Sequence, residues 1–358
     1  MISPAFDTAF CEKSTGGGGG GGGGEATAWT RPADWLTLTD PAAGEEKFVG
    51  LHAVWPTDGN FVALRFNGDY TVDWGDGSSL ENVTGNTSAY HEYTYSSISA
   101  DTESARGYRQ VIVTVTPQAG QSLTSMIMYV KHNQTGLNNS YSTGWLDMSV
   151  RLPNLTGLQI GSTGTVVLHN MLEQVKLLEN GSVSSFSNTF ANASSLRSVV
   201  LEDTSAVDNM SSMFNTCISL QSVPLFDTSA ATNVSSMFLN CTSLQSVPLL
   251  DTSAATSFVN MFSGCKTLKA IPALDASAAT FSSSYNNMFA TVNLAYIGMT
   301  GHKYTFSVAN CSLSADALDT LYTNLATVVG QTITVTGNYG TAADDPTIAT
   351  AKGWTVTG

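Results

Sequence analysis

Residues 201–224 read LEDTSAVDNMSSMFNTCISLQSVP, residues 225–248 read LFDTSAATNVSSMFLNCTSLQSVP, and residues 249–272 read LLDTSAATSFVNMFSGCKTLKAIP. The three stretches align without a gap and define a period of 24 residues. A weaker copy precedes them at 178–200, and a frayed copy with three additional residues follows at 273–297. A repeat of this length predicts a solenoid, in which each turn buries its apolar edge against its neighbours.

Within each copy the apolar residues change from helical to extended spacing. In the copy at 225–248, the positions i, i+3, i+4 and i+7 of one helical face are Val234, Met237, Phe238 and Cys241. The strand spacing L-x-x-L-x-L follows in Leu244, Val247 and Leu249. Residues 251–253 then supply turn and capping side chains that begin the next copy. The pattern predicts a mainly β solenoid with one short helix and one strand in each turn.

The repeated pattern DTS…MF..C..L..VP closely resembles the BspA-like leucine-rich repeats, and the resemblance covers residues 177–297. Known members are mostly surface proteins of bacteria, protists and phages that bind to other surfaces, and enzymatic activity is not a property of the family. The resemblance therefore implies a leucine-rich-repeat solenoid whose role is contact.

Three cysteines recur one period apart, at Cys217, Cys241 and Cys265. Each is the last residue of the apolar helical face, and Ala193 occupies the same position one copy earlier. Alanine in that column indicates a small buried side chain, so we interpret the cysteines as a ladder in the core. A soft-metal site, or a disulfide between two of them, is the alternative.

The residues after the repeat predict a cap for the last apolar turn. Ser314 is a candidate N-cap for a helix over 315–325, and residues 332–338 predict a strand. A second short helix is expected over 346–352. The ending IATAKGWTV, at 348–356, is similar to the C-terminal caps of such repeat proteins.

Residues 25–118 predict a small antiparallel β-sandwich. The apolar runs at 48–54 and 61–66 have strand length and are separated by turn residues. Residues 70–74 and 109–116 alternate apolar and polar side chains.

A short motif in this region resembles the PKD family of immunoglobulin-like domains. Its residues are Asp73, Trp74, Gly75, Asp76 and Gly77, followed by His91 and Tyr93. The resemblance implies a structural role: the acidic residue holds a turn, the glycines permit positive φ, and the histidine and tyrosine pack beside them. A metal site formed by Asp73, Asp76 and His91 is the alternative, but a turn explains all three. The long segment 96–107 departs from the usual pattern of the family.

The chain begins with a short peptide and nine consecutive glycines, Gly16 to Gly24. One interpretation is a flexible tether, because glycine has no side chain to pack. The other is that residues 1–15 dock into a partner as an anchoring arm. The first residues lack the basic and apolar regions of a secretory signal. This favours a phage protein released by lysis over a secreted one, and no apolar run has the length of a membrane span.

The composition excludes several classes of function. Only 12% of residues are charged, and 28 acidic against 14 basic side chains give a net charge of −14, which repels nucleic acid. The five histidines are scattered without an HExxH motif, and no GxSxG, P-loop or dinucleotide-binding pattern occurs in a suitable context. We therefore expect no enzymatic activity, no cofactor and no metal.

Solvent-facing positions of the repeat predict a binding surface. The candidate residues are Arg197, Gln221, Ser222, Gln245, Ser246 and Lys269. Small polar side chains on a flat, weakly charged sheet suit hydrogen bonds to a glycan or a protein. The alternative is that these side chains are merely solvated.

The predicted parts are an anchoring peptide and glycine linker (1–24), a PKD-like sandwich (25–118), a connecting segment and N-terminal cap (119–176), the solenoid (177–297) and a C-terminal cap (298–358). The main hypothesis is a non-enzymatic surface protein of a bacteriophage virion: a tail fibre, head fibre or capsid decoration. It would bind other virion proteins through residues 1–24, bind a host-surface glycan or protein through the solenoid, and be oligomeric within an assembly. The alternatives are a bacterial cell-surface adhesin that lacks its export signal and a glycan-degrading virion enzyme, which the absence of catalytic motifs disfavours.

Overall fold

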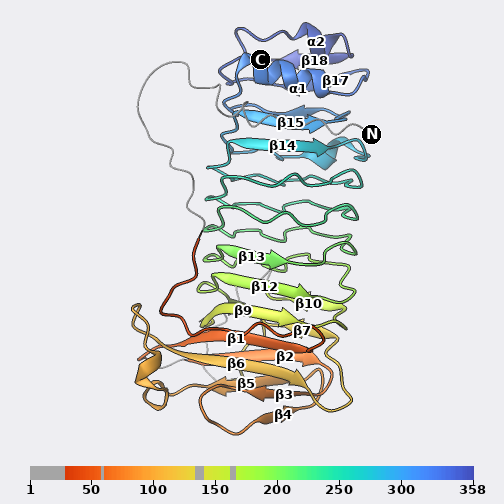
Figure 1. The fold of residues 1–358 in the computed structure, drawn as a ribbon. Helices are drawn as coiled ribbons and strands as arrows, with labels where there is room; N and C mark the ends of the chain where they lie inside the picture. The colour runs from red at the N-terminus through yellow and green to blue at the C-terminus, as the bar shows by residue number, and fades with distance from the viewer. Residues whose placement is uncertain (1–28, 58–59, 134–140, 162–166) are drawn as a thin grey trace. The chain divides into compact units, whose positions relative to one another are not determined.

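The computed structural model describes residues 29–57, 60–133, 141–161 and 167–358. From Arg31 onward the chain forms one compact unit. This unit is mainly β, with a two-sheet sandwich followed by a solenoid of about eight turns (Figure 1), so the predicted fold class is confirmed. The predicted N-terminal arm and glycine linker lie outside the described residues.

Two sheets form the sandwich. The larger has the strand order β13 (Ser198–Leu201), β12 (Gln174–Glu179), β9 (Trp145–Arg151), β1 (Lys47–Val54), β6 (Arg109–Pro117), β3 (Tyr70–Asp73) and β4 (Glu81–Val83). The smaller has the order β10 (Gly157–Gln159), β7 (Ser125–Ile127), β2 (Phe61–Asn67) and β5 (Ser88–Glu92). Phe48 of β1 and Phe66 of β2 have ring centroids 6.0 Å apart, so the two sheets bury a common apolar core.

Both sheets change from antiparallel to parallel pairing where the sandwich meets the solenoid. Strand β1 pairs antiparallel with β6 and β9, whereas β9 pairs parallel with β12, and β12 with β13. In the smaller sheet, β2 pairs antiparallel with β7, and β7 pairs parallel with β10. Sandwich and solenoid therefore share both sheets. The PKD-like identity and the domain boundaries stay predictions.

The segment that precedes β1 is held against the first solenoid strands by charged side chains. Arg31 Nε lies 2.7 Å from Asp147 Oδ2 on β9, where burial raises the pKa of the Asp147 carboxyl even though the guanidinium opposes that shift. Asp40 accepts hydrogen bonds from Ser149 Oγ at 2.8 Å and from Lys176 Nζ at 3.0 Å. These contacts join the segment to β9 and β12.

The repeat turns do not contain the predicted short helix. The four residues of the predicted helical face are fully buried, namely Val234, Met237, Phe238 and Cys241. Their backbone, however, forms successive i→i+3 turns, in which Met237 N donates to Val234 O and Cys241 N donates to Phe238 O. Between them, Ser236 and Asn240 have positive φ angles of 56° and 59°, which interrupt any helical run. Consecutive tight turns satisfy the same i, i+3, i+4 spacing, so the spacing alone did not distinguish them from a helix.

These tight turns exchange backbone hydrogen bonds with the turns before and after them. Phe214 N donates to Met237 O at 2.9 Å, and Phe238 N donates to Met261 O at 3.0 Å. Parallel bridges join Asn209, Asn233 and Ser257. The rings of Phe190, Phe214, Phe238 and Phe262 stack with successive centroid distances of 5.4, 5.6 and 5.7 Å. We call this part of each turn (residues 210–217, 234–241 and 258–265) the stack side.

The solenoid ends in further parallel strands and two short helices. Strand β14 (Ala270–Asp275) pairs with β15 (Tyr296–Thr300), and the last sheet has the order β16 (Phe306–Ser307), β17 (Gln331–Thr334) and β18 (Trp354–Thr357). Helix α1 (Ala315–Asn324) begins at Ser314, whose hydroxyl accepts a hydrogen bond from Ala317 N at 3.3 Å, and α2 is Thr347–Thr350. Both predicted helices are thus confirmed. The remaining elements are β8 (Tyr141–Ser142), β11 (Val167–Leu168), η2 (Tyr95–Ser97), η3 (Ala100–Thr102) and η4 (Ser282–Tyr285).

Candidate binding surface

A proline replaces valine at one position of the repeat, and in two of the copies with proline the predicted strand is absent. In β13 this position is Val200, and the next copies have Pro224, Pro248 and Pro272; Pro272 lies within β14, whose pairing shifts register between Ile271 and Leu274. The amide of Glu202 donates to Leu177 O of β12, and that of Ser198 to Glu173 O directly before it, so the amide of Val200 faces the same strand by the two-residue period of a ladder. Proline has no amide hydrogen to donate there. We call residues 222–227 and 246–251, which form no regular strand, the proline side.

The proline also changes which side chain enters the core. In β13, Val199 and Leu201 alternate inward. After Pro224, by contrast, Leu225 is 71% exposed and Phe226 is only 6% exposed. In the following copy Leu249 is 54% exposed while Leu250 is buried. The predicted burial of Leu249 as a strand residue is therefore wrong, because the residue after each proline turns outward.

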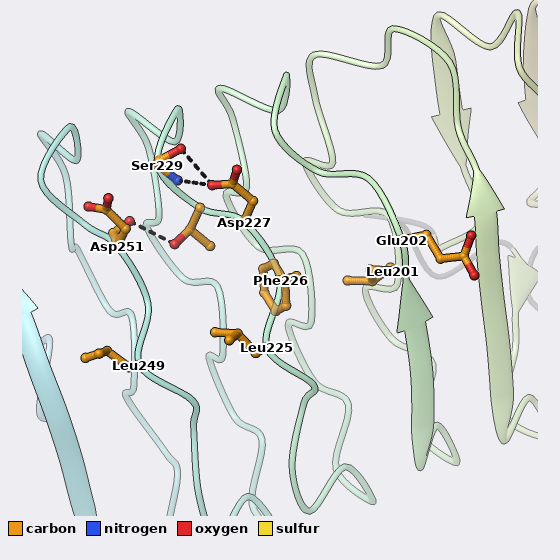
Figure 2. Close-up of a pocket in the computed structure, with 9 residues that line it drawn as sticks. Leu201, Glu202, Leu225, Phe226, Asp227, Ser229, Leu249 and Asp251 are labelled. Atoms are coloured by element: carbon orange, nitrogen blue, oxygen red, sulfur yellow. Dashed lines mark hydrogen bonds between the residues drawn. The ribbon is translucent and has the colours of Figure 1, made fainter. Parts of the chain in front are cut away.

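The displaced leucines line a shallow hollow of about 400 Å³ on the surface of the solenoid. Its walls include Leu201, Leu225, Leu249, Glu202, Asp227 and Asp251. Figure 2 shows Leu249, Leu225 and Leu201 in a row on successive turns. The carboxylates of Asp227 and Asp251 lie to one side of that row. We call this feature the leucine hollow.

The carboxylates beside the hollow are fixed by their own turns. Asp227 Oδ1 accepts hydrogen bonds from the hydroxyl and the amide of Ser229 at 2.7 and 2.9 Å. Asp251 is held by Ser253 in the same way, at 2.7 and 3.0 Å. These donors, the hydroxyls first, lower the pKa of both carboxyls below the usual value of 3.8. Both groups are therefore ionised at neutral pH.

A row of threonines connects the turns beneath the proline side. Thr204 Oγ1 donates to the carbonyl of Asp227 at 2.7 Å, and Thr228 Oγ1 donates to that of Asp251 at 2.8 Å. In the same way, Thr252 Oγ1 donates to the carbonyl of Asp275 at 2.9 Å. The side chains are buried, so these bonds are shielded from water and partly replace the missing backbone ladder.

The six predicted binding residues lie in two columns that precede the leucine hollow in each turn. Five of them are exposed, and Gln221 is half-buried. The columns are in register, since Gln245 N donates to Gln221 O at 2.8 Å. Arg197 lies beside Glu173, with 3.8 Å between Nε and Oε2. Their role in binding stays a prediction, and the hollow begins three residues after Ser222, at Leu225.

The PKD-like motif forms a compact turn. Gly75 and Gly77 have φ angles of 77° and 84°, and Asp73 Oδ1 accepts a hydrogen bond from Gly75 N at 2.9 Å. His91 Nε2 lies 2.8 Å from Asp76 Oδ2, and its ring stacks on Trp74 with centroids 5.0 Å apart. The hydroxyl of Tyr93 donates to the carbonyl of Trp74 at 2.9 Å. The carboxylates of Asp73 and Asp76, the imidazole of His91 and the hydroxyl of Tyr93 thus all have partners within the motif.

The cysteine ladder lies in the core of the stack side. Each thiol donates to a phenylalanine carbonyl of the preceding turn: Cys217 to Phe190 at 3.1 Å, Cys241 to Phe214 at 3.0 Å and Cys265 to Phe238 at 3.0 Å. Burial raises the pKa of all three thiols. In the described part of the chain, no three histidine, cysteine or acidic residues are grouped as a metal site would require. No helix among the described residues has the length and apolar character of a membrane span.

Comparison with known proteins finds one match. Residues 166–275 match the profile of a family described as Mycoplasma protein of unknown function, DUF285. The matched range includes the three gapless copies of the repeat and the whole leucine hollow. No curated protein and no solved structure matches the chain.

Sequence reasoning missed the leucines that line the hollow. It assigned Leu249 to the core and did not consider Leu225. The available signal was the change from Val-Val-Leu-Glu at 199–202 to Val-Pro-Leu-Phe at 223–226, where a second large apolar residue follows the leucine. Only one of the two can be buried once the proline has interrupted the alternation.

Proposed function

We propose that this chain is a non-enzymatic surface protein of a bacteriophage virion (a tail fibre, head fibre or capsid decoration) and that its solenoid contacts the host surface. The observation that carries the proposal is the leucine hollow, where Leu225 and Leu249 are exposed to solvent on the surface of the solenoid. A concave apolar patch on such a frame is typical of a contact surface. The resemblance of the repeat to surface proteins of bacteria, protists and phages supplies the setting.

The state of the nucleophilic and basic side chains supports a role in contact. Burial lowers the pKa of His52 to about 3, of His169 to about 4 and of His302 to about 3. The described cysteine thiols are buried as well. Three of the five histidines and the described cysteine thiols, residue types that often carry acid–base or nucleophilic catalysis, are thus enclosed in the core.

The proposal is tested by locating the chain on particles. Antibodies raised against the purified protein, coupled to gold, would be applied to phage particles and to intact cells from the same culture. We expect label at a fixed position on the particles. Label confined to the cell envelope would replace the virion assignment with the cell-surface adhesin. Release of sugars from host glycans by the purified protein would contradict the non-enzymatic assignment.

A further inference from the structure

We propose that the leucine hollow binds an extended segment of a partner protein in which apolar side chains stand next to lysine or arginine. This inference rests on the proposed contact function and names the chemistry of the partner. Three independent properties of the hollow point to such a segment: its apolar floor, the free backbone groups of the proline side, and the sign of the surrounding charge.

The floor is apolar and accessible. Leu225 and Leu249 are 71% and 54% exposed, and Leu201 closes one end of the row. Phe226 and Leu250 anchor the same two turns in the core, so the exposed leucines are not needed to hold the turns together. Covering exposed leucine with an apolar side chain is favourable by about 25 cal/mol for each Å² removed from water.

The backbone beside the floor is open to an extended partner. Within the described chain, residues 222–226 and 246–250 form no backbone-to-backbone hydrogen bond, and β13 pairs on one side only, with β12. The backbone groups of residues 222–226 and 246–250 are therefore not committed to a neighbouring turn. An extended polypeptide supplies complementary donors and acceptors together with side chains that alternate in direction.

The charge around the hollow has one sign. Residues 198–265 contain five acidic residues and no lysine or arginine. Glu202, Asp227 and Asp251 border the leucine row, and all three are exposed. Lysine or arginine next to an apolar side chain would place opposite charge at this rim and would favour encounter and orientation.

The same charge disfavours other occupants. A second copy of this chain would bring identical carboxylates together, and each copy carries a net charge of −14. A nucleic acid would be repelled in the same way. A neutral glycan would leave the carboxylates without opposite charge and would set hydroxyl groups against the leucine side chains.

The test uses the full-length protein and a displayed library of random seven-residue peptides. We expect selected peptides to be enriched in apolar residues next to lysine or arginine, compared with the unselected library. Synthetic versions of the selected peptides should bind the double variant Leu225→Ser, Leu249→Ser about tenfold more weakly. The double variant Asp227→Asn, Asp251→Asn keeps the acceptor of each turn but loses the charge. It should weaken binding by a smaller factor and reduce its dependence on salt.

The matched control is Thr232→Ala, Thr256→Ala, which changes exposed threonines in the same two copies as Leu225 and Leu249, outside both the leucine hollow and the predicted binding columns. It should bind the selected peptides like the unchanged protein. All variants alter exposed or half-buried side chains, and thermal unfolding would verify that each is folded. Equal binding by the leucine variant would overturn the inference, as would failure to enrich peptides above an unrelated protein. Binding to a glycan array that is lost in the leucine variant would instead make the hollow a glycan site.

Particle labelling separates this inference from the proposed function. If the antibodies label the particles but no peptide is enriched, or the leucine variant binds the selected peptides equally well, the partner chemistry is wrong and the virion assignment stands. If the peptides bind as expected but no particle carries the chain, the partner chemistry stands and the virion assignment is wrong.

Discussion

The stack side and the proline side of a single turn are joined by a few residues, yet they hold the solenoid together in different ways. On the stack side, amides such as that of Phe214 bond to the next turn, and the phenylalanine rings stack between 5.4 and 5.7 Å apart. On the proline side no backbone bond joins residues 222–226 to a neighbouring turn. The buried threonines and one anchored apolar residue in each turn connect the turns there.

This difference teaches that stability and display are assigned to different residues of the same repeat. The phenylalanine, the cysteine and the tight turns of the stack side each contact a neighbouring copy, so changes there affect the fold. The proline side exposes side chains that contribute little to the fold. Its surface can therefore change while the solenoid stays intact.

The largest expected effect is on the stack side. Phe238→Ala removes a ring that stacks on both neighbours, and we expect the free energy of unfolding to fall by about 3–5 kcal/mol. Urea denaturation followed by circular dichroism measures it. A loss comparable to that of the exposed-site variant Leu225→Ala would contradict the division between the two sides.

Acid should act on the core near the C-terminal strands, at the buried His302. His302 lies 3.8 Å from the Tyr285 and Phe306 rings, measured between centroids, and neither of its ring nitrogens has a hydrogen-bond partner among the described residues. Burial holds its pKa at about 3, against 6.5 in the unfolded chain. Between these values only the unfolded chain binds the proton, so stability falls as the pH decreases from about 6.5 towards 3.

At pH 5 this histidine should account for a loss of about 2 kcal/mol relative to neutral pH. His302→Phe removes the titrating group without breaking a hydrogen bond and should reduce the acid sensitivity by that amount. Denaturant unfolding of both proteins at pH 7 and pH 5 checks this. If both proteins lose the same free energy of unfolding between pH 7 and pH 5, His302 is not the group responsible.

Introducing a proline into β13 would convert a segment that pairs with β12 as a strand into one that resembles the proline side. Val200→Pro removes the amide that faces β12 and should destabilise the chain by about 1–2 kcal/mol. Hydrogen exchange should become faster in β12 and β13 and stay unchanged on the stack side. The variant Val200→Ala keeps the amide and serves as the control for the lost side chain.

The threonine row should contribute less than the ladder. Thr228→Val keeps the shape of a side chain that is 2% exposed but removes the bond to the carbonyl of Asp251, so a loss of about 1 kcal/mol is expected. Thermal unfolding measures it. A matched change at an exposed position, Thr256→Val, should leave stability closer to that of the unchanged protein.

The smallest effect on stability is expected at the hollow itself. Leu225→Ser together with Leu249→Ser should change the free energy of unfolding by no more than about 0.5 kcal/mol, since both side chains are mostly in solvent. The same variant should reduce peptide binding strongly. A large loss of stability would show that these leucines belong to the core.

The repeat made the fold predictable because its period alone fixes which residues stack. The columns of phenylalanine and cysteine, read from the aligned copies, are the buried columns of the structure. The backbone between them was not predictable from spacing, because positive φ at Ser236 and Asn240 carries no mark in the apolar pattern. Serine and asparagine are common both at the ends of helices and in tight turns.

The candidate site was harder to predict than the core. The rule of alternating faces places Leu225 beside Leu201 in an aligned column, and the alignment is correct. The two leucines differ in the face on which their side chains lie. Pro224 interrupts the ladder, so Phe226 enters the core and Leu225 points outward. The proline in place of Val200 and the large apolar residue in place of Glu202 were the signs of this in the sequence.

The gapless 24-residue period of neighbouring copies has a genetic consequence. The 24-residue unit corresponds to a whole number of codons, so unequal recombination between two copies preserves the reading frame. A turn gained or lost in this way meets the same phenylalanine, cysteine and threonine columns on both sides. The protein can therefore change its length, and the number of exposed leucines that it displays, in a single event without redesigning its core.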